Sequence, residues 1–132
     1  MATTYDDHDM GAAAWADAPR GNATRLVITV TSRDGCPVVT AIGEIDLATV
    51  DSLNATLEQE IAPDRKVVAD LAETTFVDSN GLRAMLVASM RARDGGGVLV
   101  IVPGRALAFV ADLAGVTEYL NLAPDLETAL RA

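Results

Sequence analysis

The centre of the sequence places an acidic residue, a hydroxyl and a glycine directly after two apolar residues, in the run Phe76-Val77-Asp78-Ser79-Asn80-Gly81-Leu82. Upstream, the apolar and β-branched run Lys66-Val67-Val68-Ala69-Asp70-Leu71 is typical of a buried strand. Downstream, side chains recur at helical spacing, at Leu82, Met85, Leu86, Ser89 and Met90. The pattern predicts a strand that leads through a loop into a helix over residues 79–93, with Ser79 at or near the helix N-cap.

This position gives Ser79 two interpretations. The first N–H groups of a helix have no intrahelical acceptor, so a serine oxygen can accept from them and stabilise the helix by about 1 kcal/mol. The same N–H groups and the positive end of the helix dipole also favour a phosphate at this end. The residues of the junction alone do not separate a structural cap from a functional hydroxyl.

Hydropathy patterns on both sides of the junction predict strands and helices in alternation. Two β-rich runs, residues 24–31 and 37–43, flank the turn Arg33-Asp34-Gly35 and predict a hairpin. The other expected elements, in chain order, are a helix from Leu47 to Ile61 before Pro63, a strand over 98–102, a helix over about 105–113 before Gly115, a short strand at 119–122 and a closing helix over 124–130 with Leu126 and Leu130 inward. Such alternation predicts an α/β fold with a parallel-rich sheet and helices packed on it.

Length and charge bound the organisation and the partners. The chain has 132 residues, half of them apolar, which suffices for one domain with a core and is too short for two. We expect a disordered acidic tail over residues 1–22, where no period is sustained, and one domain over 23–132. The net charge of −9, with scattered Lys and Arg, leaves no basic face for nucleic acid. The expected partners are therefore proteins.

Motifs that the sequence lacks narrow the function further. No run approaches the roughly 18 apolar residues of a membrane span, and the start resembles no signal peptide, so we expect a cytoplasmic protein without direct membrane insertion. Phosphate-loop, dinucleotide, zinc-protease and serine-hydrolase motifs are all missing. The single histidine, His8, lies in the expected tail, and the single cysteine, Cys36, can form neither a disulfide nor a metal cluster within the chain. We expect no catalytic residue, no metal site and no cofactor.

The order of the motifs resembles the STAS domain family, and bacterial anti-sigma-factor antagonists in particular. The matching motifs are Gly43-Glu44-Ile45-Asp46-Leu47-Ala48-Thr49, Val67-Val68-Ala69-Asp70-Leu71, the run over residues 76–82 and Gly96-Gly97-Val98-Leu99. One motif alone would be a weak signal, whereas the set in this order, over about residues 25–131, is specific. The resemblance implies a STAS-like mixed sheet of four to five strands with about four helices packed on it.

The resemblance also implies a partner switch that regulates transcription, in systems such as stress responses. An unphosphorylated antagonist binds an anti-sigma factor, often a serine kinase, and thereby frees a sigma factor. The kinase then phosphorylates the motif serine, here Ser79, and in many systems a serine phosphatase reverses the step. By the same resemblance Asp46 lies near this serine, and the expected partner-binding residues are Asp46, Asp78, Ser79, Asn80 and Gly81.

Electrostatics gives this switch a physical basis. A phosphoserine carries about −1.5 to −2 charges at neutral pH, here beside Asp78 and near Asp46. Like charges at a packed interface lower the affinity for a partner.

Other interpretations stay open at this stage. Asp46 and Asp78 are each as compatible with helix capping as with partner contact, and Gly81 suits a close backbone approach. Asn80 stands where many relatives carry a small hydroxyl or alanine. Two other functions are compatible with the sequence: a non-switching STAS scaffold subunit of a lipid-transport or stress-sensing complex, and a domain that binds a nucleotide or small anion at the Ser79 helix end.

Overall fold

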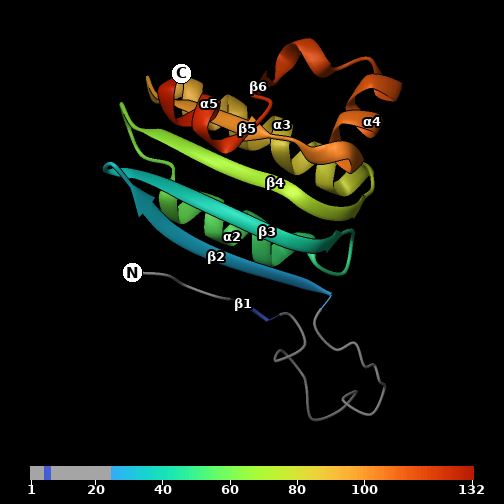
Figure 1. Ribbon diagram of the computed structural model, residues 1–132. Helices are drawn as coiled ribbons and strands as arrows, with labels where there is room; N and C mark the ends of the chain where they lie inside the picture. Colours follow the sequence, from blue (N-terminus) through green and yellow to red (C-terminus); the bar gives the residue numbers. More distant parts are fainter. Residues whose placement is uncertain (1–4, 7–24) are drawn as a thin grey trace.

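The computed structural model describes residues 5–6 and 25–132 and shows a single sheet with helices on both of its faces (Figure 1). The strands are β1 (Tyr5–Asp6), β2 (Leu26–Arg33), β3 (Cys36–Ile45), β4 (Lys66–Val77), β5 (Val98–Val102) and β6 (Asn121–Leu122). The helices in these residues are α2 (Val50–Glu60), α3 (Ser79–Asp94), α4 (Gly104–Ala114), the 3-10 helix η2 (Thr117–Tyr119) and α5 (Leu126–Arg131). The predicted α/β class and alternation are confirmed.

The sheet is mixed and runs in the order β1-β2-β3-β4-β5-β6. β2 pairs antiparallel with β1 and β3, whereas β3, β4, β5 and β6 pair in parallel. The predicted hairpin is present between β2 and β3. Its two-residue loop, Asp34 and Gly35, has positive φ at both positions, as a type I′ turn requires.

The predicted tail enters the described structure only at Tyr5 and Asp6, which pair with Ile28 and Val27 as the short strand β1. The remainder of the predicted tail, His8 and Trp15 included, lies outside the described residues.

Two apolar cores lie on opposite faces of the sheet because successive strand residues point to opposite sides. Val67, Ala69 and Leu71 belong to the larger core, which α2, α3 and α4 cover. Val68 belongs to the smaller core, which contains Ala129 of α5. In Figure 1 this arrangement appears as α2 and α3 behind the sheet and α5 in front of it. β4 is therefore buried on both faces, which explains its nearly continuous apolar start.

β4 is longer than the sequence pattern predicts, since it continues from Leu71 to Val77 instead of ending in a loop. The added residues pair with the end of β3, with register shifts between Thr40 and Ile42 and between Gly43 and Glu44. Long-range pairing thus makes a strand of a segment whose polar residues indicate a loop. As a result α3 begins two residues after the strand ends.

Smaller boundary differences occur elsewhere. α2 begins at Val50, because residues 46–49 form a turn and the Leu47 side chain is 73% exposed. The predicted strand at 119–122 is confined to residues 121–122. Gly115 has φ of 73° and ends α4 in the left-handed conformation, as predicted. In α5, Leu126 and Leu130 are half-buried and pack against the smaller core, as predicted, and Ala129 is fully buried.

Within the described part of the chain, none of the helices has the length and apolarity needed to cross a membrane.

Candidate functional site

The carboxyl ends of the parallel strands β3 and β4 bring Asp46 and Asp78 to one edge of the sheet. Ile45 and Val77, the last residues of the two strands, are register partners, and each aspartate follows directly. The Asp78 N–H donates to the Ile45 carbonyl oxygen at 3.1 Å. The predicted proximity of Asp46 to the junction around Ser79 thus rests on strand pairing and one backbone hydrogen bond.

Asp78, and not Ser79, is the N-cap of α3. Its carboxylate accepts from the N–H groups of Asn80 at 2.8 Å and Gly81 at 3.2 Å, and from the Asn80 side-chain amide at 3.3 Å. Its backbone is extended, with φ of −100° and ψ of −171°, as an N-cap requires. Ser79 therefore lies next to the N-cap, as predicted, and the capping role that the sequence left open for Asp78 is observed.

The cap has an electrostatic consequence for Asp78. Burial raises the pKa of this carboxyl group, but hydrogen bonds from Gly81 and Asn80 favour the ionised form and leave the pKa below its ordinary value. The Leu47 N–H acts in the same direction. Asp78 is thus a negative charge beside Ser79 at neutral pH.

Ser79 is the first residue of α3 and is exposed. Its hydroxyl makes no hydrogen bond to any residue that the structure describes. Because Asp78 accepts the capping hydrogen bonds, the Ser79 hydroxyl is not needed as a helix cap, and it is exposed at the surface.

Asp46 is held by two sets of contacts. One carboxylate oxygen accepts from the N–H groups of Ala48 at 3.0 Å and Thr49 at 3.2 Å. The other pairs with the guanidinium of Arg25, whose Nε also lies 3.5 Å from a carboxylate oxygen of Glu44. These contacts fix the turn between β3 and α2, so Asp46 shapes this edge of the site as well as contributing charge to it.

Two residues that hold Asp46 were not among the predicted site residues. Thr49 is fully buried, accepts from the Asp46 N–H at 3.0 Å and donates to the Glu44 carbonyl oxygen at 2.8 Å. An Asp with Thr three residues later is a recognisable local turn signal. Arg25 directly precedes β2 and Asp46 directly follows β3, so the two residues are 21 positions apart in sequence. The pairing of β2 with β3 brings them together.

Gly81 is buried inside the first turn of α3. A Cβ at this position would lie 2.7 Å from Cγ2 of Ile45 and 2.8 Å from Cγ1 of Val77. The glycine thus allows α3 to pack closely on the ends of β3 and β4, which confirms the close approach predicted near the helix start. Its backbone supports the site from beneath.

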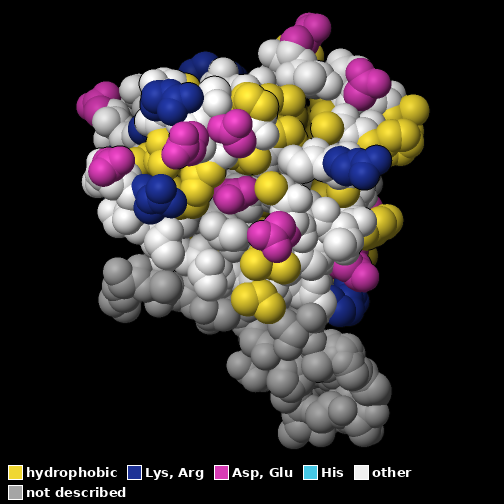
Figure 2. Space-filling model, in the orientation of Figure 1, with side chains coloured by type: hydrophobic (Ala, Val, Ile, Leu, Met, Phe, Trp, Pro, Cys, Tyr) yellow, Lys and Arg dark blue, Asp and Glu magenta, His cyan; other side chains and the backbone are white. Residues whose placement is uncertain are grey.

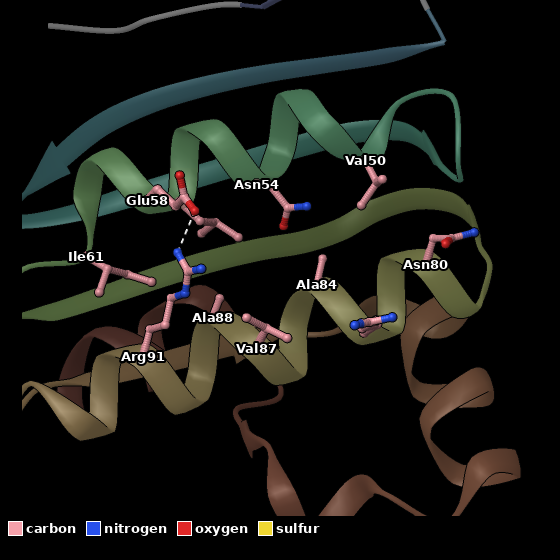
Figure 3. A pocket seen from close by; sticks show the side chains of 11 residues that line it. Val50, Asn54, Glu58, Ile61, Asn80, Ala84, Val87, Ala88 and Arg91 are labelled. Carbon is pink, nitrogen blue, oxygen red and sulfur yellow. Dashed lines mark hydrogen bonds and ion pairs between the residues drawn. The ribbon is translucent and has the colours of Figure 1, made fainter.

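Asn80 is half-buried at one end of a groove between α2 and α3 with a volume of about 310 Å³ (Figure 3). Apolar residues of both helices form much of its lining, among them Leu57, Ala84 and Val87. At the other end, Arg91 and Glu58 form an ion pair of 2.5 Å across the groove (Figure 3). The groove therefore starts beside the Ser79 turn and runs along α3.

Exposed apolar side chains also surround the junction, which sequence patterns did not indicate. Leu47 is 73% exposed, Phe76 49% and Phe109 67%. Phe76 and Phe109 line a second hollow, of about 680 Å³, between the end of β4 and the start of α4. On the face drawn in Figure 2, acidic and basic side chains of the described residues are interspersed among apolar ones, and the basic side chains on this face do not gather into one patch. Such a surface suits a protein partner better than nucleic acid.

Comparisons with known proteins give the same fold. A family model described as the STAS domain matches residues 27–129. No curated protein sequence matches the chain at a significant level.

The solved structures that are similar to this chain include three anti-sigma-factor antagonists. An anti-sigma factor antagonist from Mycobacterium paratuberculosis has a TM-score of 0.72 and 28% identity, over 80% of this chain and 92% of the other. An anti-sigma-factor antagonist (STAS) domain protein from Planctomyces limnophilus has a TM-score of 0.65 and 18% identity, over 79% and 96%. The anti-sigma factor antagonist SpoIIAA in its unphosphorylated form has a TM-score of 0.60 and 16% identity, over 78% and 92%. The last two comparisons support the fold alone.

Proposed function

We propose that this chain, which belongs to the STAS domain family, is an anti-sigma-factor antagonist that is switched off by phosphorylation of Ser79. The observation that carries the proposal is the exposed Ser79 hydroxyl on the first turn of α3, which bonds to none of the described residues and lies beside a cap supplied by Asp78. The similarity to the mycobacterial anti-sigma factor antagonist over most of both chains supports it. The role is regulatory and not catalytic, and the bound partner is an anti-sigma factor.

The unmodified domain binds its partner through the surface around the junction. Exposed Leu47 and Phe76 supply apolar area next to the polar groups of Asp46, Asp78, Ser79 and Asn80. Apolar contacts with a polar rim are typical of transient protein interfaces. Gly81 contributes by setting how closely α3 approaches β3.

Phosphorylation requires a kinase and ATP, and the anti-sigma factor itself is the proposed serine kinase. The Ser79 oxygen attacks the γ-phosphorus of ATP, the bond to the β-phosphate oxygen breaks, ADP leaves, and the hydroxyl proton passes to a base of the kinase. No helix cap has to break first, because Asp78 and not Ser79 accepts from the free N–H groups. A serine phosphatase restores the hydroxyl by hydrolysis.

Release follows from the added charge. The phosphate adds about −1.5 to −2 charges next to Asp78, which is ionised at neutral pH. A change from 1% to 99% free partner needs a roughly 10⁴-fold difference in affinity. Binding of the phosphorylated domain would strip water from a dianion at a partly apolar interface. Because burial of an unpaired charge is very costly, this desolvation can account for an affinity difference of that size. We place this switch in the cytoplasm, where it regulates transcription in a stress response.

Intact-mass measurement tests the proposal. The full-length protein is incubated with magnesium, ATP and each candidate anti-sigma kinase of the source organism, and binding to each kinase is measured in parallel. Wild type and the Ser32→Ala variant, which removes an exposed serine of β2, are expected to gain one phosphoryl group and to leave the kinase. Ser79→Ala is expected to bind and to gain none. A kinase that binds the domain without phosphorylating it would instead favour a scaffold without a switch.

A further inference from the structure

Arg83 is an exposed arginine on α3 that forms no ion pair with any residue the structure describes. Two other arginines around the site are already engaged, Arg25 with Asp46 and Arg91 with Glu58. Arg83 lines the α2–α3 groove next to Asn80. In Figure 3 the groove runs along α3 from Asn80 to Arg91. Arg83 follows Asn80 by three residues, about one helical turn. The arginine is therefore free to accept an anion near the start of α3.

The helical geometry places Arg83 one turn after Ser79. Residues four apart in a helix lie on the same side, with about 5–6 Å between their Cβ atoms. Helical side chains lean toward the N-terminus, so the Arg83 side chain extends back over the turn that carries Ser79. An anion that precedes a cation by four residues is also the more stabilising order of such a pair.

We propose that Arg83 binds the phosphate group on Ser79, so that phosphorylation forms an ion pair along the first turn of α3. The inference rests on the proposed phosphorylation of Ser79. A guanidinium presents two N–H groups in a fork that matches two phosphate oxygens, a geometry that lysine cannot supply. Both side chains are exposed and belong to one rigid helix, so the pair forms without any movement of the sheet.

The pair changes the surface in a second place besides Ser79. In the unmodified domain the unpaired Arg83 gives the α2–α3 groove a positive charge, because Arg91 and Glu58 neutralise each other. In the phosphorylated domain the ion pair with the phosphate neutralises this positive charge. Phosphorylation thereby removes from the groove the cation that would attract a carboxylate of a bound partner.

Other charged groups near Ser79 define the controls. Asp78 and Asp46 are acidic and cannot pair with the phosphate. Arg105 of α4 is exposed and lines the hollow that contains Phe76 and Val77, so it is the competing cation. Arg93 lies on α3 about 21 Å further along the helix axis than Ser79, is exposed, and provides a variant with the same loss of charge far from the site.

The experiment installs phosphoserine at position 79 of the full chain during translation, which needs no kinase, and follows its single ³¹P resonance as a function of pH. The second pKa of an unpaired phosphoserine is about 6, and a paired cation lowers it. Arg83→Gln is expected to raise this pKa by roughly 0.2 to 0.7 of a unit relative to the unsubstituted phosphoprotein. Arg83→Lys is expected to raise it less, and Arg93→Gln and Arg105→Gln to leave it nearly unchanged.

Two results would overturn the inference: an Arg83→Gln titration that coincides with that of the Arg93→Gln control, or a larger shift in Arg105→Gln than in Arg83→Gln. Because the phosphate is introduced without a kinase, either result would leave the proposed phosphorylation intact. Conversely, a lack of phosphoryl transfer by every kinase would not alter these titrations.

Discussion

Replacing Asp78 with alanine removes the acceptor for two backbone N–H groups at the start of α3. These N–H groups, of Asn80 and Gly81, lie 2.8 and 3.2 Å from the Asp78 oxygen. Loss of an N-cap side chain typically lowers the free energy of unfolding by about 1 kcal/mol, within a range of 0.5–2. Because α3 packs on the core and starts with this cap, we expect Asp78→Ala to fall in that range.

Ser79→Ala is the matched variant on the next residue. The Ser79 hydroxyl makes no hydrogen bond to a described residue and is exposed, so its loss breaks no contact. Alanine also has a higher helix propensity than serine, by a few tenths of a kcal/mol. We therefore expect the free energy of unfolding of Ser79→Ala to stay within about 0.5 kcal/mol of wild type.

Urea unfolding of the full-length variants at pH 7, followed by circular dichroism, measures both values. Asp78→Asn separates geometry from charge, since an Asn oxygen still accepts the two hydrogen bonds, and we expect a smaller loss than for Asp78→Ala. Equal losses in Ser79→Ala and Asp78→Ala would refute the assignment of the cap. They would also remove the argument that the serine is free for modification.

The same carboxylate predicts how stability depends on pH. The folded-state pKa of Asp78 is lower than its unfolded value of about 3.9, so the unfolded chain binds more protons in the acid range. Its contribution to stability is then complete above the unfolded pKa and is lost as the pH falls through the folded-state value. The difference in free energy of unfolding between wild type and Asp78→Asn should shrink below about pH 4. A difference that stays constant down to pH 2 would contradict the lowered pKa.

Two further substitutions test the packing beneath the site. Gly81→Ala places a methyl group within 2.7 Å of Ile45 Cγ2. Overpacking of about 1–3 kcal/mol, less about 1 kcal/mol of helix propensity, predicts a loss of up to about 2 kcal/mol in urea unfolding, and a gain in stability would show that α3 accommodates the methyl group without cost. A double-mutant cycle of Arg25→Met and Asp46→Asn should give a favourable coupling of about 0.5–1 kcal/mol for the partly exposed pair, and a coupling of zero would show that Arg25 does not hold Asp46.

The order of the elements could be predicted because each strongly patterned segment carries its own local signal. The turn at Asp34 and Gly35 needs positive φ at both residues, which Asp and Gly supply. The strand at 98–102 consists only of apolar residues between a glycine run and a proline, and its predicted bounds match β5. Helical spacing likewise located α3 to within one residue of its observed end.

The differences arise where distant parts of the chain meet. β4 continues to Val77 because β3 pairs with it there, and no local pattern reports that pairing. This extension brings Asp78 to the N-cap position directly before Ser79, where the helix begins as predicted. The close fit of Gly81 against Ile45 and the pairing of Arg25 with Asp46 also depend on tertiary contacts.

For the site itself, the sequence indicated a candidate segment, residues 76–82, but could not assign a role to each residue within it. Asp78 and Gly81 turn out to have structural contacts that account for their residue types, a cap and a close approach. Ser79 has none among the described residues. That contrast is a physical reason to expect function at Ser79, and it appears only when burial and hydrogen bonds are known.

The most direct test of the central claim is the ratio of two dissociation constants for the same anti-sigma factor, measured by calorimetry with unmodified protein and with protein that carries phosphoserine at position 79. The account predicts that phosphorylation weakens binding by several orders of magnitude, up to the roughly 10⁴-fold needed for a complete switch. Equal affinities of the two forms for an anti-sigma factor that binds the unmodified protein would contradict it.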